Sequence, residues 1–392
     1  MLLVMGQIRS EKQKIHIMRH KIAELCFVLA LFCELLVSVS GFAFGFYGEP
    51  KIILLGMVLF SAKILLTCNW KKDWIWFLIC GSYGLLCYYF QSSALILRIA
   101  LFCLAARDQD AEKGMKIFFW GTTVIMLYAG VLSALGRHNT LYLEQVFRNE
   151  PERRWCFGFF HPNGFSFFVF RTMLLGLYLY GKKMPARMAT FFFAVTGLFV
   201  FLAGSKMGIF LFGAVVLAFI IIRFWNNEKK IKMFYCAGNI AITAELLLIC
   251  SALWFMETVP GTQEGVGVWD FFNRLTTGRL YFANKIWNEV SPGLFGFRDF
   301  MEATEIGLVN MFYNQGIIFA LGYIILVFVL LREMYRKKNM WGMLLILAFM
   351  GYSLSEAFIP YVNKNAIWML VPYLQKINSK EGCMENEQKK DD

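Results

Sequence analysis

Four arginines in two polar stretches of an otherwise apolar chain have the chemistry of a phosphate-binding site. Arg153 and Arg154 precede the sequence FGFFHPNGF. Arg274 and Arg279 flank the sequence LTTG. A guanidinium stays charged at any relevant pH and offers a planar fork of donors, so it fits a pyrophosphate better than the point charge of lysine does. The alternative is a solvated face on which these arginines form ordinary ion pairs with nearby acidic residues.

The sequence HPN begins a hydrophobic run and predicts the start of a helix. Proline is favoured at the first helical position, so Pro162 is expected to begin the helix and His161 to cap it. The N–H groups of Asn163 and Gly164 would then be free, and free amides at a helix N-terminus form an anion site suited to phosphate. The alternative interpretation is that HPN is only a turn.

A charged residue lies deeper in the same predicted helix. Arg171 follows Gly164 by nearly two helical turns, which places both on one helical face. A charge near the middle of a membrane span is costly and usually faces a water-filled cavity or a partner. We expect Arg171 to contact substrate or, alternatively, to pair with a buried glutamate such as Glu245 or Glu356.

Two smaller polar clusters follow along the chain. The sequence GSK contains Lys206, and NMFYNQG contains Asn310 and Tyr313. Both clusters are expected to face the same compartment as the arginines and to bind substrate there. The alternative for each is a helix cap or a turn.

The composition predicts which elements hold these polar stretches. Apolar residues make up 58% of the 392 residues, Phe occurs 41 times, and the mean hydropathy is +0.54. Backbone groups in lipid must be satisfied inside helices or closed barrels, and the alternating pattern of barrel strands is absent. The chain is therefore predicted to be an all-α integral membrane protein that associates with the lipid bilayer.

Runs of about 20 apolar residues, the length that crosses a bilayer, predict a polytopic bundle of about 11–12 transmembrane helices. The predicted spans are 22–42, 52–67, 74–90, 92–106, 115–135, 163–181, 187–203, 207–225, 232–254, 307–331 and 340–358, with 365–374 as a further span or a re-entrant piece. The predicted parts are a basic N-terminal arm at 1–21, a membrane domain at 22–374 and a polar tail at 375–392.

The distribution of Lys and Arg predicts the orientation of the bundle. Positive residues close to spans are retained in the cytoplasm, and they are more frequent in the loops that a cytoplasmic N-terminus places inside. Both termini are therefore expected in the cytoplasm and the chain in the cell (plasma or inner) membrane. Two outer loops follow, at about 136–162 and 256–306, and apolar residues at helical spacing predict a short amphipathic helix around 283–290 of the larger one. The net charge of +12 reflects this topology and does not indicate binding to nucleic acid.

The order of the motifs resembles that of the bacterial O-antigen polymerase and ligase-like membrane glycosyltransferases, in particular the capsular or exopolysaccharide repeat-unit polymerases. The matching pieces, over roughly residues 140–370, are GFFHPNGF, GSK, TGR followed by PGLFGF, NMFYNQG and a last span with Glu356. The chain departs from the family pattern at Lys206, where arginine is usual, and at Val309, where an acidic residue is frequent.

The resemblance implies transfer of a growing glycan from a polyprenyl diphosphate carrier to a lipid-linked oligosaccharide repeat unit at the outer face, without metal or cofactor. A chain-length regulator and a flippase would be partners. The implied catalytic residues are Arg153, Arg154, Arg279 and His161. His161 is the first choice of general base, with Glu305 or Asp270 behind it. The implied substrate-binding residues are Asn163, Gly164, Arg171, Arg274, Lys206, Asn310 and Tyr313.

Three other interpretations come from different classes of protein. A ligase of the same superfamily typically has a histidine in the large outer loop, and none occurs between Met256 and Ile306. A flippase or transporter predicts two pseudo-symmetric halves with short loops, and the sequence lacks both features. A structural membrane protein without catalysis would not require arginine to concentrate in the outer loops, against the positive-inside trend.

Overall fold

The computed structural model describes residues 2–45, 49–68, 70–147, 150–224, 228–259, 262–297 and 304–374. The predicted polar tail at 375–392 lies outside these described residues. Within them the chain is all-α apart from one hairpin of two strands.

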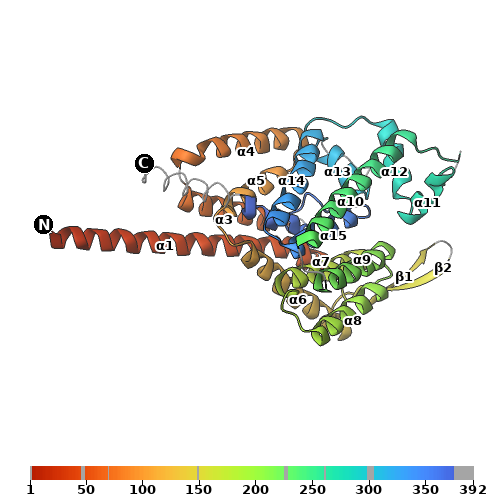
Figure 1. The fold of residues 1–392 in the computed structure, drawn as a ribbon, viewed down its shortest axis with the longest axis horizontal. Coiled ribbons are helices and arrows are strands. Elements are labelled where there is room, and N and C mark those ends of the chain that lie inside the picture. Colours follow the sequence, from red (N-terminus) through yellow and green to blue (C-terminus); the bar gives the residue numbers. More distant parts are fainter. Residues whose placement is uncertain are drawn as a thin grey trace.

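Helices form an elongated bundle, and α1 projects well beyond its neighbours at one end (Figure 1). The helices are α1 (Leu2–Leu35), α2 (Gly41–Phe44), α3 (Pro50–Thr67), α4 (Trp70–Gln91), α5 (Leu95–Ala105), α6 (Ala111–Ala134), α7 (Pro162–Tyr180), α8 (Ala186–Leu202), α9 (Lys206–Phe224), α10 (Glu228–Phe255), α11 (Val268–Leu275), α12 (Arg279–Glu289), α13 (Gly307–Asn314), α14 (Ile317–Arg336) and α15 (Met340–Ser353). A π-helical turn at Leu36–Ser40 joins α1 to α2, and a 3₁₀ helix covers Ala366–Leu370.

Six of the described helical segments are long and apolar enough to cross a membrane. They are Gln13–Phe44, Pro50–Thr67, Ala111–Ala134, Lys206–Phe224, Glu228–Phe255 and Ile317–Arg336. Leu95–Ala105, Ala186–Leu202 and Met340–Ser353 are shorter apolar helices. The predicted fold class is confirmed as that of a multi-pass helical membrane protein, whereas the larger number of spans stays a prediction.

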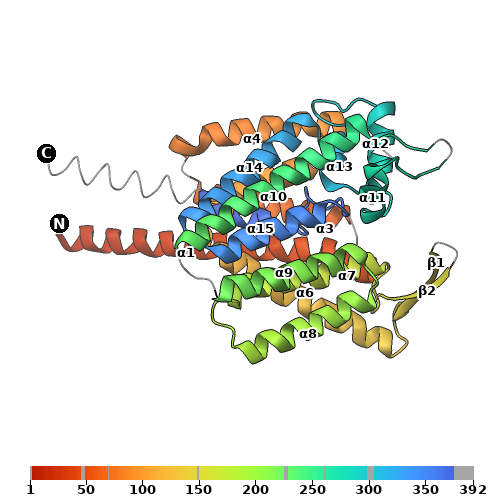
Figure 2. The ribbon, with the colours of Figure 1, turned by 45° about the vertical axis from the view of Figure 1, so that its right-hand side comes forward.

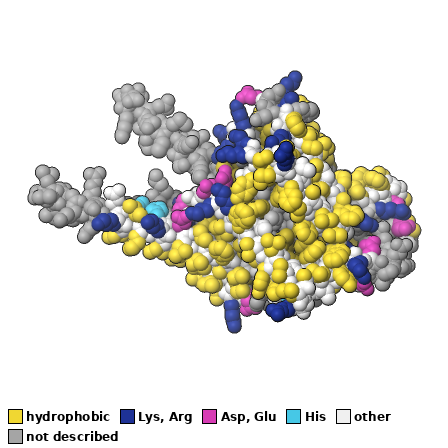
Figure 3. Space-filling model, turned by 90° about the horizontal axis from the view of Figure 1, so that it is seen from below, with side chains coloured by type: hydrophobic (Ala, Val, Ile, Leu, Met, Phe, Trp, Pro, Cys, Tyr) yellow, Lys and Arg dark blue, Asp and Glu magenta, His cyan; other side chains and the backbone are white. Residues whose placement is uncertain are grey.

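Apolar side chains cover the outside of the bundle as well as its core. Large apolar residues such as Leu78 on α4 and Ile240 on α10 are 60% and 69% exposed. Yellow apolar side chains dominate the middle of the face in Figure 3. In contrast, nearly every side chain of α7 is buried, so the helix that begins with HPN runs through the centre of the bundle (Figure 2). This distribution suits a bundle whose outer surface meets lipid.

The predicted span at 307–331 is wrong as a single helix, because the chain breaks between α13 and α14. Gly316 occupies the break with a φ of 91°, a conformation that disfavours side chains. A Cβ atom at Gly316 would also lie 2.4 Å from the backbone N of Gly296. The backbone N of Ile317 donates to Gly293 O at 3.1 Å, so the sequence PGLFGF of the large loop packs directly against the break.

The C-terminal part of the bundle is shorter than predicted. Helix α15 ends at Ser353, so Glu356 lies beyond its end rather than within a span. The segment predicted at 365–374 contains a buried 3₁₀ helix at Ala366–Leu370, which is too short to cross a bilayer. This short helix does not support a further span at 365–374, and the re-entrant interpretation stays a prediction.

The two predicted outer loops lie at the same end of the molecule, opposite the beginning of α1 (Figure 1). The smaller loop forms an antiparallel hairpin of β1 (Tyr142–Phe147) and β2 (Glu150–Trp155), which the sequence analysis did not predict. In the larger loop the predicted amphipathic helix is confirmed as α12, which buries Leu280, Ala283 and Ile286.

Candidate functional site

The start of α7 has the predicted cap. Pro162 is the first helical residue, and His161 caps the helix by accepting a hydrogen bond at Nδ1 from the Asn163 N–H, at 3.1 Å. This corrects one detail of the prediction, because the Asn163 amide is bonded to its own cap and is not free. Gly164 lies against the ring of Phe42, so closely that a Cβ atom would come within 3.1 Å of it.

Strand β2 separates the two arginines of the smaller loop, because successive side chains of a strand point to opposite sides. Arg154 points toward the bundle, where its Nε donates to Ala203 O at 3.0 Å and its Nη2 donates to Asn163 Oδ1 at 2.5 Å. Arg153 points outward and pairs with Glu144 at 2.8 Å. Of this pair, only Arg154 reaches the start of α7.

The larger loop separates its two arginines in a similar way. Arg279 is the first residue of α12 and follows Gly278, whose φ of 87° turns the chain at the helix cap. Its Nη2 lies 2.6 Å from Glu305 Oε2, and its side chain is 14% exposed. Arg274 is 68% exposed and pairs with Asp270 one helical turn away, at 2.8 Å.

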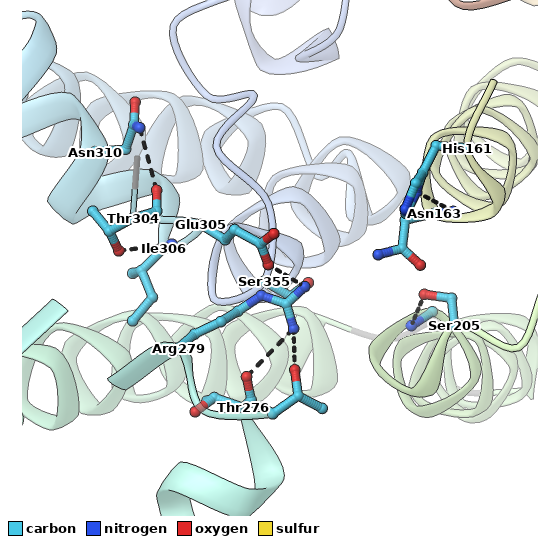
Figure 4. A network of polar contacts seen from close by, with 12 residues as sticks. His161, Asn163, Ser205, Thr276, Arg279, Thr304, Glu305, Ile306, Asn310 and Ser355 are labelled. Carbon is cyan, nitrogen blue, oxygen red and sulfur yellow. Dashed lines mark hydrogen bonds and ion pairs between the residues drawn. The ribbon is translucent and has the colours of Figure 1, made fainter. Parts of the chain in front are cut away.

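A cavity of about 280 Å³ lies between the two loops and the helix starts. Figure 4 shows His161 and Asn163 on one side and Arg279 with Glu305 on the other. The charged and hydrogen-bonding residues that line it are Glu152, Arg154, His161, Asn163, Ser205, Lys206, Thr276, Thr277, Arg279, Glu305, Ser355 and Glu356. We call it the cationic cavity after Arg154, Lys206 and Arg279, which reach it from three separate elements. Three carboxylates, those of Glu152, Glu305 and Glu356, also line it.

Three helices begin at the cationic cavity. They are α7 behind His161, α9 at Lys206 and α12 at Arg279. Ser205 accepts a hydrogen bond from the Gly208 N–H at 3.3 Å and so supports the start of α9. Each helix N-terminus carries partial positive charge, and the three starts add to the field of the side-chain cations.

A second, apolar cavity of about 280 Å³ adjoins the first and shares His161, Asn163, Glu305 and Glu356 with it. Four phenylalanines, Gly164 and Lys364 complete its lining; the phenylalanines are Phe42, Phe167, Phe168 and Phe358. A molecule with a polar head and an apolar chain would find a matching environment for each end in this pair of cavities.

Burial shifts the pKa values of titratable groups around the cationic cavity. Burial lowers the pKa of His161 below its usual value, and the nearby charge of Arg154 lowers it further, so the imidazole is neutral at pH 7. The pKa of Arg154 is also lowered by burial. Burial raises the pKa of Glu356 to about 7, although the charge of Arg279 opposes this shift. Glu356 is thus poised to exchange a proton near neutral pH.

Arg171 lies outside both cavities, and its side chain is fully buried. It donates to the backbone carbonyl of Asn363 and to the hydroxyl of Thr122, and its guanidinium lies 5.0 Å from the ring centre of Phe168. The expected alternative partner Glu245 instead accepts a hydrogen bond from Ser353. Arg171 therefore fixes the segment that carries Lys364, and the predicted substrate contact stays untested.

A buried ion pair between α5 and α1 shows how the charge of another arginine in the bundle is neutralised. Arg98 of α5 is bound by the carboxylate of Glu34 on α1, with its Nε 2.5 Å from Oε1. Both side chains are almost fully buried. This carboxylate neutralises the charge locally, which is the usual arrangement for a buried ion.

Asn310 and Tyr313 also lie outside the cationic cavity. The Asn310 side chain donates to Thr304 O at 3.2 Å. The Tyr313 hydroxyl donates to Val290 O at 2.7 Å, and its ring is fully buried. These contacts join α13 to the large loop, in keeping with the structural interpretation of NMFYNQG.

Several residues that line the cationic cavity were not among the predicted site residues. Glu356 was considered only as a partner of Arg171 and as a family feature, although an acidic residue at the end of an apolar run is itself a signal of function. Thr276 and Thr277 lie within the LTTG sequence between the two arginines, and Ser355 directly precedes Glu356. Their approach to one cavity depends on tertiary structure.

No family model matches the chain, and no curated protein matches it. Among the residues that the structure describes, no three His, Cys, Asp or Glu side chains form a group that could hold a metal ion. The expectation of a reaction without metal or cofactor stays a prediction.

Proposed function

We propose that the protein is a polysaccharide polymerase of the O-antigen polymerase and ligase-like class. It transfers a growing glycan from a polyprenyl diphosphate carrier to a lipid-linked repeat unit at the outer face of the cell membrane. The observation that carries this proposal is the convergence of three helix starts and three cationic side chains on one cavity with an apolar neighbour. That combination fits a diphosphate bound to a long hydrocarbon chain.

The diphosphate binds in the cationic cavity. Arg279 offers its guanidinium edge, and Arg154 and Lys206 approach from the other elements. Glu305, which is 61% exposed, holds Arg279 at 2.6 Å. An incoming diphosphate replaces this exposed carboxylate, which then returns to solvent at little cost.

The polyprenyl chain enters the apolar cavity. The rings of Phe42, Phe167 and Phe358 line it, and Gly164 lets the ring of Phe42 pack closely against the start of α7. The shared residues His161 and Asn163 lie where the diphosphate would meet the hydrocarbon. Because the outside of the bundle is apolar, the rest of the chain remains in lipid.

Geometry makes Glu356 a better general base than His161. The Nδ1 atom of His161 accepts a hydrogen bond from its own helix, so the neutral imidazole carries its proton on Nε2. That nitrogen is a donor, suited to a phosphate oxygen. Glu356 lines the same cavity and has a pKa near 7, the value at which a carboxylate can accept a proton at neutral pH.

The proposed reaction is a single displacement at the anomeric carbon of the donor glycan. The acceptor hydroxyl oxygen forms the new bond to this carbon while the bond to the diphosphate oxygen breaks, and polyprenyl diphosphate leaves with the electron pair. Glu356 takes the hydroxyl proton. Arg154, Lys206 and Arg279 stabilise the negative charge that develops on the leaving group.

A ligase-type transferase, which passes the glycan to a different acceptor, would use the same donor chemistry. The large loop has no histidine, which is the feature that family ligases typically place there. A flippase would need neither a base nor a leaving-group site beside the apolar cavity. The arrangement of Glu356 with the cationic cavity therefore favours a transferase over a flippase. The lack of a histidine in the large loop favours the polymerase over the ligase.

A deletion strain that carries the wild-type chain or a variant tests this proposal. The polymerase predicts that loss of the protein leaves single lipid-linked repeat units on the outer face and that the wild-type chain restores long polymer. Units trapped on the inner face would point to a flippase. Long polymer on the carrier that does not reach its final acceptor would point to a ligase.

A further inference from the structure

A third cavity, of about 450 Å³, lies apart from the arginines and the three helix starts. The turn between α4 and α5 lines one side, and the break between α13 and α14 lines another. Ser92, Ser93, Asn310, Asn314, Tyr361 and Lys364 are among its polar lining residues. Its size lies within the range of small-molecule sites, about 300–1,000 Å³.

Side-chain amides of this cavity have hydrogen-bonding capacity that the protein does not use. Gln91 and Gln315 line it and are 4% and 6% exposed, and the Oε1 atom of each lacks a partner among the described residues. Gln91 Nε2 donates to Phe295 O at 2.5 Å, so the side chain is held in place by its nitrogen. The side chain of Asn314 has no hydrogen bond to another described residue. Buried polar atoms without protein partners are rare in native proteins, and a ligand hydroxyl group close to these two oxygens would satisfy them.

The chemistry of the lining suits a ligand rich in hydroxyl groups. Among the described lining residues there is no carboxylate, and Lys364 is the one side chain with a full charge. Amide groups both donate and accept, which matches a hydroxyl that does the same. The rings of Phe297 and Tyr361 provide aromatic surface for the C–H face of a sugar. A diphosphate would gain little here, because the arginines of the cationic cavity do not reach this lining.

We propose that this amide-lined cavity binds neutral sugar rings of a glycan, separately from the diphosphate. Lys364 lines both this cavity and the apolar one, so a single side chain separates the two. If the proposed function holds, the sugar bound here belongs to one of the two lipid-linked glycans and is positioned relative to the diphosphate by the Lys364 segment. Binding of a sugar does not itself depend on that function.

The test measures saturation-transfer NMR on the full-length protein in lipid nanodiscs. The probes are D-glucose, D-galactose, N-acetyl-D-glucosamine and N-acetyl-D-galactosamine, with inorganic pyrophosphate measured separately by calorimetry. Asn314→Leu removes an amide that the described protein does not use, and Asn288→Leu is a matched control on the exposed face of α12. If the Asn314→Leu protein does not accumulate in the membrane, Asn314→Ala is measured in its place. Arg279→Met changes the cationic cavity alone.

We expect at least one sugar to bind the wild-type protein and to lose about fivefold or more of its affinity in the Asn314 variant, because one amide hydrogen bond contributes about 1 kcal/mol. Asn288→Leu and Arg279→Met should leave sugar binding unchanged. The absence of any sugar signal, or equal binding by the Asn314 variant, would overturn this inference. If the Arg279→Met protein binds pyrophosphate as tightly as wild type, the proposed function is contradicted. That result would not affect the proposed sugar site.

Discussion

Each of the two outer loops has a pair of neighbouring arginines, one of which faces solvent while the other lines the cationic cavity. Arg153 and Arg274 pair with carboxylates of their own loops, at 2.8 Å in both cases. Arg154 and Arg279 lie against the starts of helices, and each donates to a carbonyl oxygen of the bundle or loop. All four residues are arginines, so the difference between the solvent-facing pair and the cavity-lining pair comes from their surroundings.

The comparison shows that an arginine-rich loop is not by itself a binding site. In the smaller loop, the alternation of strand β2 sends Arg153 outward and Arg154 inward. In the larger loop, the left-handed Gly278 turns the chain so that Arg279 begins α12 beside Glu305. An exposed ion pair contributes about 0–1 kcal/mol, whereas a preorganised donor in an enclosed site contributes far more to a reaction.

The largest expected effect comes from a residue that neither loop supplies. Glu356→Gln should lower the turnover of lipid-linked repeat unit by about 100-fold or more, because it removes the proposed general base. The wild-type rate should rise with pH and level off above about 7, since the carboxylate must be deprotonated to act and its pKa is about 7. Steady-state rates of the purified protein from acidic to alkaline pH measure both effects.

A pH profile of Glu356→Gln provides the control for this assignment. The variant should lose the rise near pH 7 and keep the same abundance in the membrane. A variant that retains the same rise would contradict the role of Glu356, and His161→Gln would then be the next protein to measure, because glutamine keeps a cap acceptor.

Arg279 offers the sharpest test of the comparison within the larger loop. Arg279→Met should reduce polymer formation by about 100-fold, because it removes a charged donor from the leaving-group site. Arg274→Met is the matched control and should retain wild-type polymer, because its guanidinium faces solvent. Polymer length and yield in the deletion strain, normalised to protein abundance, give the measurement. Equal losses in both variants would show that the loop acts only as a charged surface.

The smaller loop allows the same comparison, with a smaller expected loss of function. Arg154→Met should raise the KM for the lipid-linked unit by about tenfold, since its guanidinium is partly used to hold Asn163 and a charge-assisted hydrogen bond contributes about 1.5–3 kcal/mol. Its neighbour on the strand, Arg153→Met, is the control. A larger loss in the Arg153 variant would reverse the assignment of the two faces of β2.

The smallest effect is expected when both solvent-facing arginines change together. The double variant Arg153→Met with Arg274→Met should differ from wild type by less than about twofold in polymer yield, because exposed ion pairs contribute ~0–1 kcal/mol. Its response to added salt should also match that of wild type. A strong loss of activity in this protein would indicate that the exposed arginines steer the substrate to the cavity.

Composition and local pattern were enough to predict the membrane bundle and the start of α7. The HPN sequence contains its own capping information, and the structure confirms both His161 and Pro162 in their expected places. The hairpin was not predicted, because its two strands have six residues each and pair only with each other among the described residues. The break at Gly316 was also missed, because the apolar pattern continues across it and only the packing of the PGLFGF segment explains it.

Local sequence could not decide which predicted residues would share a cavity. The position of Arg171 within a predicted span favoured a contact with substrate. In the structure its guanidinium instead donates a hydrogen bond to the backbone carbonyl of Asn363. Glu356 enters the cavity only because α15 ends early and the following segment folds back. Such placements depend on contacts between segments far apart in sequence, and local spacing carries no information about them.

Binding of bare polyprenyl diphosphate to the full-length protein in nanodiscs tests the central claim most directly. Two double variants remove the same number of arginines, one from the cavity (Arg154→Met with Arg279→Met) and one from the surface (Arg153→Met with Arg274→Met). We expect the cavity pair to weaken binding by about 100-fold, as loss of two charge-assisted contacts implies, and the surface pair to leave it unchanged. Equal affinity of the two double variants would contradict the account.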